Sequence, residues 1–265
     1  MTNVISFSSN HAGSDHPISA DTAVRITHST RAGLFTDIET HLCTRLGFTL
    51  ATINLDHAVK LRRDPVFRDA YLRHSHVVAD GTPIIWLSRL AGRKVELIPG
   101  SELIAPLCEL AARLGEPVGL LGSTAATLEQ AARVLETEFP GLHIVAQIAP
   151  PFGLDVHGNE ADLLLEQLEA SGARLCFLAL GAPKQEMLAV RGAERLPYCG
   201  FVSIGAGLDF IAGTQTRAPV WVRRLAMEWA WRIALHPRRL TRRYIDCFLI
   251  LPSLGLSALQ SRFRN

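Results

Sequence analysis

The stretch Leu175-Cys-Phe-Leu-Ala-Leu180, followed at once by Gly181-Ala-Pro-Lys-Gln-Glu186, decides the fold class. Six consecutive apolar residues are typical of a strand buried on both faces, and the glycine and proline behind them predict a tight turn. From Pro183 to Glu194, apolar residues then recur with a helical period. A buried strand, a short turn and an amphipathic helix form one unit of a parallel sheet.

The same unit recurs along the chain. We expect strands at Phe48–Leu55, His76–Ala79, Val118–Leu121, Leu142–Ala146, Leu175–Leu180 and Phe201–Ile204. We expect helices at Ser101–Leu114, Ala125–Glu138, Glu160–Ser171 and Pro183–Glu194. Strands that alternate with helices predict an α/β fold, Rossmann-like, with a mostly parallel sheet flanked by helices and followed by a C-terminal helical appendage.

Composition divides the 265 residues into three parts. Residues 1–20 are rich in Ser, Asn, His and Asp without an apolar run, which predicts a disordered leader and excludes a signal peptide. Residues 21–214 form the expected α/β catalytic core. Residues 215–265 hold three of the four tryptophans and form the appendage, in which we expect two helices, the first ending at His236-Pro237 and the second carrying Arg238–Leu251.

The appendage also carries the positive charge. From Arg217 onward there are ten Arg, no Lys, one Glu and one Asp, a net charge of +8, so the first 216 residues must carry −6 within the total of +2. A basic end on an acidic body indicates an anionic partner, either nucleic acid or lipid. Tryptophans beside Phe248-Leu-Ile-Leu251 favour helices on an anionic membrane surface, with no nucleic acid.

No apolar run reaches the roughly 18 to 20 residues of a spanning helix. The longest candidate, Tyr244–Gln260, contains Asp246, Pro252 and Gly255. We therefore expect this segment to lie on a bilayer or to pack against the core. The arginines nearest the core in sequence, Arg217, Arg223, Arg224 and Arg232, can instead turn inward, where guanidinium groups fit diphosphate oxygens, or face solvent on helix surfaces.

Several classes of site are excluded by missing motifs. The five cysteines form no Cys-x-x-Cys pair, which fits a reducing compartment without structural zinc. There is no P-loop, no His-Glu-x-x-His and no Asp-x-Asp. The ten histidines show no ligand spacing, and we expect His57, His74 and His76 near the first strands to be surface or supporting residues. We therefore expect neither a metal nor a cofactor.

Polar residues directly after the strands are the candidate site, because ligands of open parallel sheets bind beyond the carboxyl ends of the strands. These positions are Thr52 and Asn54, then Asp80-Gly81, then Gly181 to Glu186, then Gly205-Ala-Gly-Leu-Asp209. Asp80 can take a proton from an attacking hydroxyl, or it can cap the helix that begins near Thr82.

The two later turns also have two interpretations each. Gly181 to Glu186 places Lys184 and free backbone N–H groups at a helix start, which suits an anion but also describes an ordinary turn. Gly205-Ala-Gly-Leu-Asp-Phe210 imitates a dinucleotide fingerprint whose third glycine is replaced by Phe210. A nicotinamide oxidoreductase therefore remains an alternative, as does a non-catalytic membrane scaffold.

Taken together, the motifs resemble the WecG/TagA/CpsF glycosyltransferases, family twenty-six of the sugar transferases, from about Gly47 to Tyr244. Besides the turns above, the resemblance rests on Pro99-Gly100-Ser-Glu102-Leu, Leu120-Leu-Gly122, Ala212-Gly213, Arg217-Ala-Pro219-x-Trp221, Glu228-Trp229, Arg232, Pro237-x-Arg239 and Arg242-Arg243. One departure is Glu96-Leu97, where the family usually has Glu-Arg.

The resemblance implies an inverting, metal-independent hexosyltransferase that moves a sugar from a UDP-sugar to a polyprenyl-diphosphate-linked saccharide, in exopolysaccharide or cell-surface polysaccharide synthesis. It implies a cytoplasmic protein, peripheral on the inner face of the cell membrane, whose appendage adds arginines to the site. The catalytic residues expected are Asp80, Thr52 and Asn54. The substrate-binding residues expected are Gly81, Gly122, Gly181, Lys184, Gln185, Glu186, Gly205, Asp209, Arg217, Arg224 and Arg232.

Overall fold

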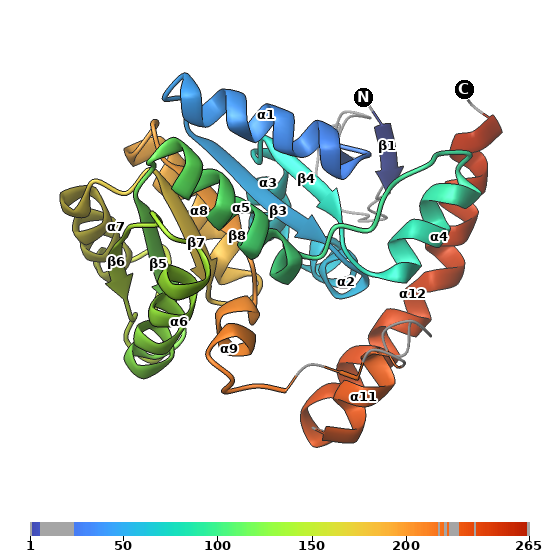
Figure 1. Cartoon of the computed structure of the whole chain (residues 1–265). Coiled ribbons are helices and arrows are strands. Elements are labelled where there is room, and N and C mark those ends of the chain that lie inside the picture. Colours follow the sequence, from blue (N-terminus) through green and yellow to red (C-terminus); the bar gives the residue numbers. More distant parts are fainter. Residues whose placement is uncertain are drawn as a thin grey trace.

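The computed structural model describes residues 2–5, 24–216, 218–219, 222, 228–235 and 237–263. Its centre is a sheet of six parallel strands in the order β4-β3-β8-β7-β5-β6 (Figure 1). The strands are β3 (Phe48–Ile53), β4 (His76–Ala79), β5 (Val118–Gly122), β6 (Ile144–Ile148), β7 (Leu175–Ala179) and β8 (Gly200–Ser203). The predicted parallel α/β fold is confirmed, and each predicted strand is present with ends shifted by two residues at most.

Helices flank the sheet, and each of them contributes buried apolar residues to a core cluster. They are α1 (Arg31–Cys43), α2 (Leu55–Arg63), α3 (Pro65–Leu72), α4 (Thr82–Leu90), α5 (Gly100–Leu114), α6 (Ala125–Glu138), α7 (Asn159–Ser171), α8 (Lys184–Arg195) and α9 (Gly207–Ile211). Local sequence fixes several of their starts. The side chains of Thr30, Asp64 and Thr124 accept backbone N–H groups at the starts of α1, α3 and α6, as N-cap residues do.

Part of the predicted disordered leader is a strand. β1 (Thr2–Ile5) pairs antiparallel with β2 (Val24–Ile26), and Thr2 lies opposite Ile26. Val24 and Ile26 of β2 are buried in the core, so the pair of strands is anchored through β2. Residues 6–23 lie outside the described part of the chain.

The C-terminal helix is much longer than the sequence predicts. α11 (Glu228–Leu235) is followed by α12 (Pro237–Phe263), which continues through Pro252 for twelve residues beyond the predicted end at Leu251. By length and composition alone, Leu240–Phe263 can cross a membrane, with a mean hydropathy of 1.2. The expectation that no segment reaches this length is therefore wrong, because Pro252 does not end the helix.

One face of α12 packs against the core. Leu254 and Ala258 are buried together with Ile84 and Leu87 of α4, and Figure 1 shows α12 running alongside α4 at the β4 side of the sheet. Asp246 accepts two hydrogen bonds from Arg63 of α2, at 2.8 and 3.1 Å. α12 is thus fixed to the two helices that follow β3 and β4.

Candidate active site

Turns from five adjacent strands meet at the carboxyl edge of the sheet. β4, β3, β8, β7 and β5 are parallel neighbours in this order, and Asp80, Asn54, Gly205, Gly181 and Gly122 stand at or directly after their ends. The structure therefore brings together the residues that the sequence marks separately. Arg217 and Arg224 lie outside the described residues, and of Arg232 only the backbone in α11 is described.

Asp80 lies at the mouth of this edge next to Thr52. The Thr52 hydroxyl lies 3.5 Å from Asp80 Oδ2, and the Asp80 N–H donates to the Ile53 carbonyl at 2.8 Å. The N-cap position of α4 is held by Gly81, whose φ of 88° favours glycine, and no side chain caps this helix. Asp80 is therefore not the N-cap residue, and its half-buried carboxylate is positioned by the strand ends.

Thr52 is held in place by Tyr71, which the sequence analysis missed. The Tyr71 hydroxyl donates to the Thr52 carbonyl at 2.9 Å and lies 2.7 Å from His57 Nδ1. Burial, together with the charges of Glu186 and Asp80, raises the pKa of Tyr71 well above its usual value. Burial lowers the pKa of His57 to about 3. A neutral phenol and a neutral imidazole therefore support the strand that carries Thr52.

His57, His74 and His76 are expected from the sequence to be surface or supporting residues, and the structure excludes the surface position. All three are buried. His57 supports Tyr71, and His74 Nδ1 lies 2.8 Å from the Ala70 carbonyl within α3. Each imidazole has a polar partner for at least one ring nitrogen, whereas Nε2 of His74 is buried without a hydrogen bond among the described residues.

Asn54 has a structural task at the start of α2. Its Oδ1 accepts the His57 N–H at 3.0 Å, which makes it the N-cap residue. The cap uses only the amide oxygen, so the NH₂ group of Asn54 is not part of it.

The turn after β7 is joined to the turn after β8 through Gln185. Its Oε1 accepts the Gly205 N–H at 3.0 Å, while its Nε2 donates to Glu186 Oε1 at 2.8 Å. Glu186 is fully buried, and burial raises its pKa to about 7. Lys184 Nζ donates to the Leu154 carbonyl at 2.7 Å. Gln185 and Glu186 thus hold the two turns in register, and Lys184 ties them to the loop before α7.

Asp209 links the turn after β5 to α9. Its Oδ1 accepts from Ser123 Oγ at 2.8 Å, and its Oδ2 accepts from Gln215 Nε2 at 3.3 Å. Close packing requires glycine at position 122, because a Cβ atom there would lie 2.4 Å from the Ala179 carbonyl oxygen of β7. Ser123 was missed, although it follows a strand end in the same way as the other site residues.

The charges around the first turn of α2 connect the site to the C-terminal helix. Asp56 Oδ2 lies 2.7 Å from Lys60 Nζ, and Asp56 Oδ1 lies 2.7 Å from Arg243 Nε. Lys60 also donates to the Ala182 carbonyl, in the turn after β7, at 3.1 Å. Arg243 is therefore an arginine of the appendage that turns inward, which the sequence offers as one of two orientations for Arg217, Arg223, Arg224 and Arg232.

Comparison with known proteins identifies the family of the chain. The model of the glycosyl transferase WecG/TagA/CpsF family matches residues 21–265. The chain belongs to this family. This WecG/TagA/CpsF glycosyltransferase is 24% identical over 217 residues to the N-acetylglucosaminyldiphosphoundecaprenol N-acetyl-beta-D-mannosaminyltransferase of Bacillus subtilis (strain 168), covering 82% of this chain and 80% of the relative.

Proposed function

We propose that the protein transfers a sugar from a UDP-sugar to a polyprenyl-diphosphate-linked saccharide, with inversion, in the synthesis of an exopolysaccharide or cell-surface polysaccharide. The observation that carries this proposal is Asp80, a half-buried carboxylate beside Thr52 at the mouth of the sheet. Family membership supports it, as does the relative, whose name gives a lipid-diphosphate acceptor and a mannosamine-derived sugar.

The reaction we infer is a single displacement. The acceptor hydroxyl attacks the anomeric carbon while Asp80 accepts its proton, and the bond from that carbon to the UDP oxygen breaks. One displacement inverts the configuration. The NH₂ group of Asn54 and the hydroxyl of Thr52 would orient the reacting sugar. Asp209, Lys184 and the glycine turns at Gly81, Gly122, Gly181 and Gly205 would shape the donor site.

The departing UDP would be neutralised by arginines, since preorganised cations stabilise charge that develops in the transition state. Arg217, Arg224 and Arg232 are the proposed residues from the appendage. Gln185 and Glu186 would position the site without contacting the substrate, because both side chains are buried. They are hydrogen-bonded to each other, and Gln185 also accepts the Gly205 N–H. No step requires a metal or a cofactor.

We further infer that the protein is peripheral on the cytoplasmic face of the cell membrane. The face of α12 turned away from the core exposes an apolar stripe, which consists of Ile245, Leu249, Leu256, Leu259 and Phe263. Arg238, Arg242 and Arg262 are exposed on the same helix. An apolar stripe with arginines suits the interface of an anionic leaflet. Because the opposite face is packed on α2 and α4, the helix is suited to lie on the bilayer.

A panel of UDP-sugars with a short-chain lipid diphosphate acceptor tests the function. N-acetylmannosamine, its uronic acid and glucose are the first donors to try. We expect Asp80→Asn to keep the fold and UDP binding and to lose turnover by a factor on the order of 100 or more. Asp69→Asn, at an exposed carboxylate on α3, is the control. Normal turnover of Asp80→Asn would remove Asp80 from its role, and binding of NAD but not UDP would favour an oxidoreductase.

A further inference from the structure

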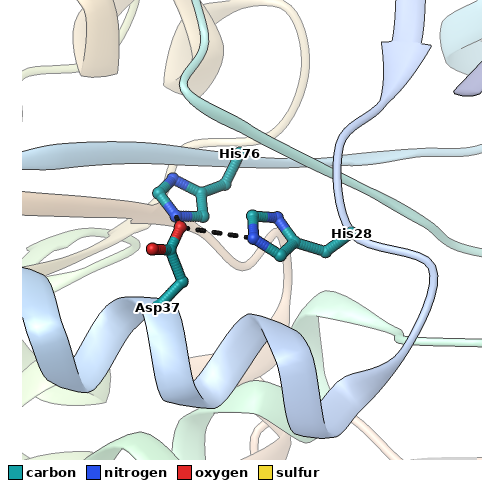
Figure 2. Close-up of side chains that lie close together, drawn as sticks. All are labelled: His28, Asp37 and His76. Carbon is teal, nitrogen blue, oxygen red and sulfur yellow. Dashed lines mark hydrogen bonds and ion pairs between the residues drawn. The ribbon is translucent and has the colours of Figure 1, made fainter. Parts of the chain in front are cut away.

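Three polar side chains converge at the amino end of β4, away from the proposed active site (Figure 2). His28 lies between β2 and α1, Asp37 is on α1, and His76 is the first residue of β4. The Nε2 atoms of His28 and His76 lie 3.2 and 2.9 Å from the same oxygen, Asp37 Oδ2. The three atoms lie within 4.8 Å of one another, and the two imidazole rings stack with centroids 4.8 Å apart.

The other nitrogen of each ring is held by a neighbouring hydroxyl. His28 Nδ1 lies 3.0 Å from Thr27 Oγ1, and His76 Nδ1 lies 2.8 Å from Ser75 Oγ. Such contacts fix the orientation of the rings, in the way that outer hydrogen bonds orient the histidines of metal sites. Both Nε2 atoms are thereby aimed at one carboxylate oxygen.

The hydrogen atoms of these hydroxyls decide what the Nε2 atoms present to Asp37. Thr27 Oγ1 donates to the Val77 carbonyl at 3.3 Å, and Ser75 Oγ donates to the Thr49 carbonyl at 3.1 Å. A hydroxyl has one hydrogen, so a hydroxyl that donates to its carbonyl accepts from the Nδ1–H of the neighbouring ring. In this tautomer the lone pair of each Nε2 faces Asp37. Two nitrogen lone pairs and one carboxylate oxygen are then directed at the same point and are available to a cation.

The spacing and chemistry of the three atoms suit a late first-row metal. With bonds of about 2.0–2.2 Å and tetrahedral angles, two ligand atoms of zinc lie about 3.3 Å apart. Two of the three separations, 2.9 and 3.2 Å, are close to this value, and the third, between the two imidazole nitrogens, is at most 4.8 Å. Two imidazoles with one carboxylate suit zinc, cobalt or nickel, whereas magnesium and calcium prefer oxygen ligands alone.

We propose that His28, Asp37 and His76 bind zinc or another late first-row divalent cation, with water at the remaining positions. The ion would join α1 and the loop before it to β4. Its role is structural, because Asp80 follows the opposite end of β4, about 13 Å away along the strand. The inference is independent of the proposed transfer reaction.

Titration of the full chain with Zn²⁺ and Co²⁺, after chelator treatment and dialysis, tests the site. We expect one equivalent to bind, Co²⁺ to give visible absorption bands from its nitrogen and oxygen ligands, and Zn²⁺ to raise the Tm. His28→Gln and Asp37→Asn should each weaken binding at least about tenfold, because each removes a ligand. Both residues are only partly buried, so these variants are expected to fold.

His157→Gln is the matched control, since His157 is an exposed histidine on a distant loop. It should bind metal like the wild type. Absence of saturable binding by the folded wild type overturns the proposal. Retention of full affinity in both His28→Gln and Asp37→Asn overturns it as well, as it places the bound ion elsewhere.

Discussion

Arg243 of α12 and Asp56 of α2 form an ion pair, with 2.7 Å between Nε and Oδ1. Burial opposes the charge of Asp56, yet Arg243 and Lys60 lower the pKa of this carboxyl below its usual value. Asp56 lies in the first turn of α2, two residues after the N-cap residue Asn54. The C-terminal helix is thus bonded to the edge of the sheet where the sugar transfer is proposed to occur.

Arg243→Gln removes one of the two cationic partners of Asp56 and should lower the free energy of unfolding. The loss should be only about 1–2 kcal/mol, because Asp56 keeps Lys60 as a partner and Arg243 is partly exposed. Turnover should fall as well, because Asn54, which is proposed to contact the substrate, is the N-cap residue of α2. Arg242→Gln, at the exposed neighbour, is the control and should change stability by less than about 0.5 kcal/mol. Thermal unfolding and transferase assays measure both effects, and equal behaviour of the two variants would contradict the prediction.

Asn54 variants can separate helix capping from substrate contact. Serine caps helices about as well as asparagine, so Asn54→Ser should keep stability, whereas Asn54→Ala should lose about 1 kcal/mol. Because serine lacks the amide NH₂ group, Asn54→Ser should still lose turnover at least about tenfold. Chemical denaturation and kinetics of the two variants check this. Full turnover in Asn54→Ser would show that Asn54 only caps α2 and does not contact the substrate.

Glu186→Gln should change the pH dependence of stability. Burial raises the pKa of Glu186 from 4.5 to about 7, so the folded state keeps a proton that the unfolded chain has lost. The stability from this proton is complete below about pH 4.5 and is lost as the pH rises through about 7. Glutamine does not titrate. The stability of Glu186→Gln relative to the wild type should therefore increase from about pH 5 to about pH 8, by on the order of 3 kcal/mol.

Thermal unfolding at several pH values measures this difference. His57, whose pKa is lowered to about 3 by burial, contributes an opposite trend in acid, but it is common to both proteins and cancels. Glu109→Gln, at an exposed position of α5, is the control and should follow the wild type at every pH. A constant difference between Glu186→Gln and the wild type would refute the assignment.

The apolar stripe of α12 should determine membrane binding. Leu249 and Leu256 are 72% and 63% exposed, and each leucine buried in a membrane contributes about 1.5–3 kcal/mol. Leu249→Glu and Leu256→Glu should each reduce co-sedimentation with anionic liposomes about tenfold or more. Leu46 lies in the α/β part of the chain and is 59% exposed, so Leu46→Glu is the control and should not change co-sedimentation. Equal binding by all three variants would place the membrane contact elsewhere.

The strands and their turns could be predicted from sequence because each is coded locally. Leu175–Ala179 and Val118–Gly122 are continuous apolar runs that end in glycine turns, so their ends mark the site. Pro252 misled the prediction of α12, because tertiary contacts of Leu254 and Ala258 hold the helix together beyond it. β2 has only three residues, too few for a periodic signal.

Side-chain groups from distant elements could not be predicted in the same way. Tyr71 reaches Thr52 from a helix 19 positions away, and nothing in its own segment indicates the contact. His28, Asp37 and His76 have no ligand spacing in the sequence, since a loop, a helix and a strand each supply one of them. Only the packing of α1 on β4 brings them together.

The packing of α12 also bears on how the protein can be divided. Leu254 and Ala258 fill the same apolar cluster as Ile84 and Leu87, and Arg63 and Asp56 have their partners on this helix. Cutting the chain near residue 215, where its composition changes, would uncover that cluster, remove the partner of Arg63 and leave Asp56 with Lys60 alone. A fragment ending there should aggregate. A freely soluble enzyme is better obtained by making the outer stripe of the helix polar while its inner face stays intact.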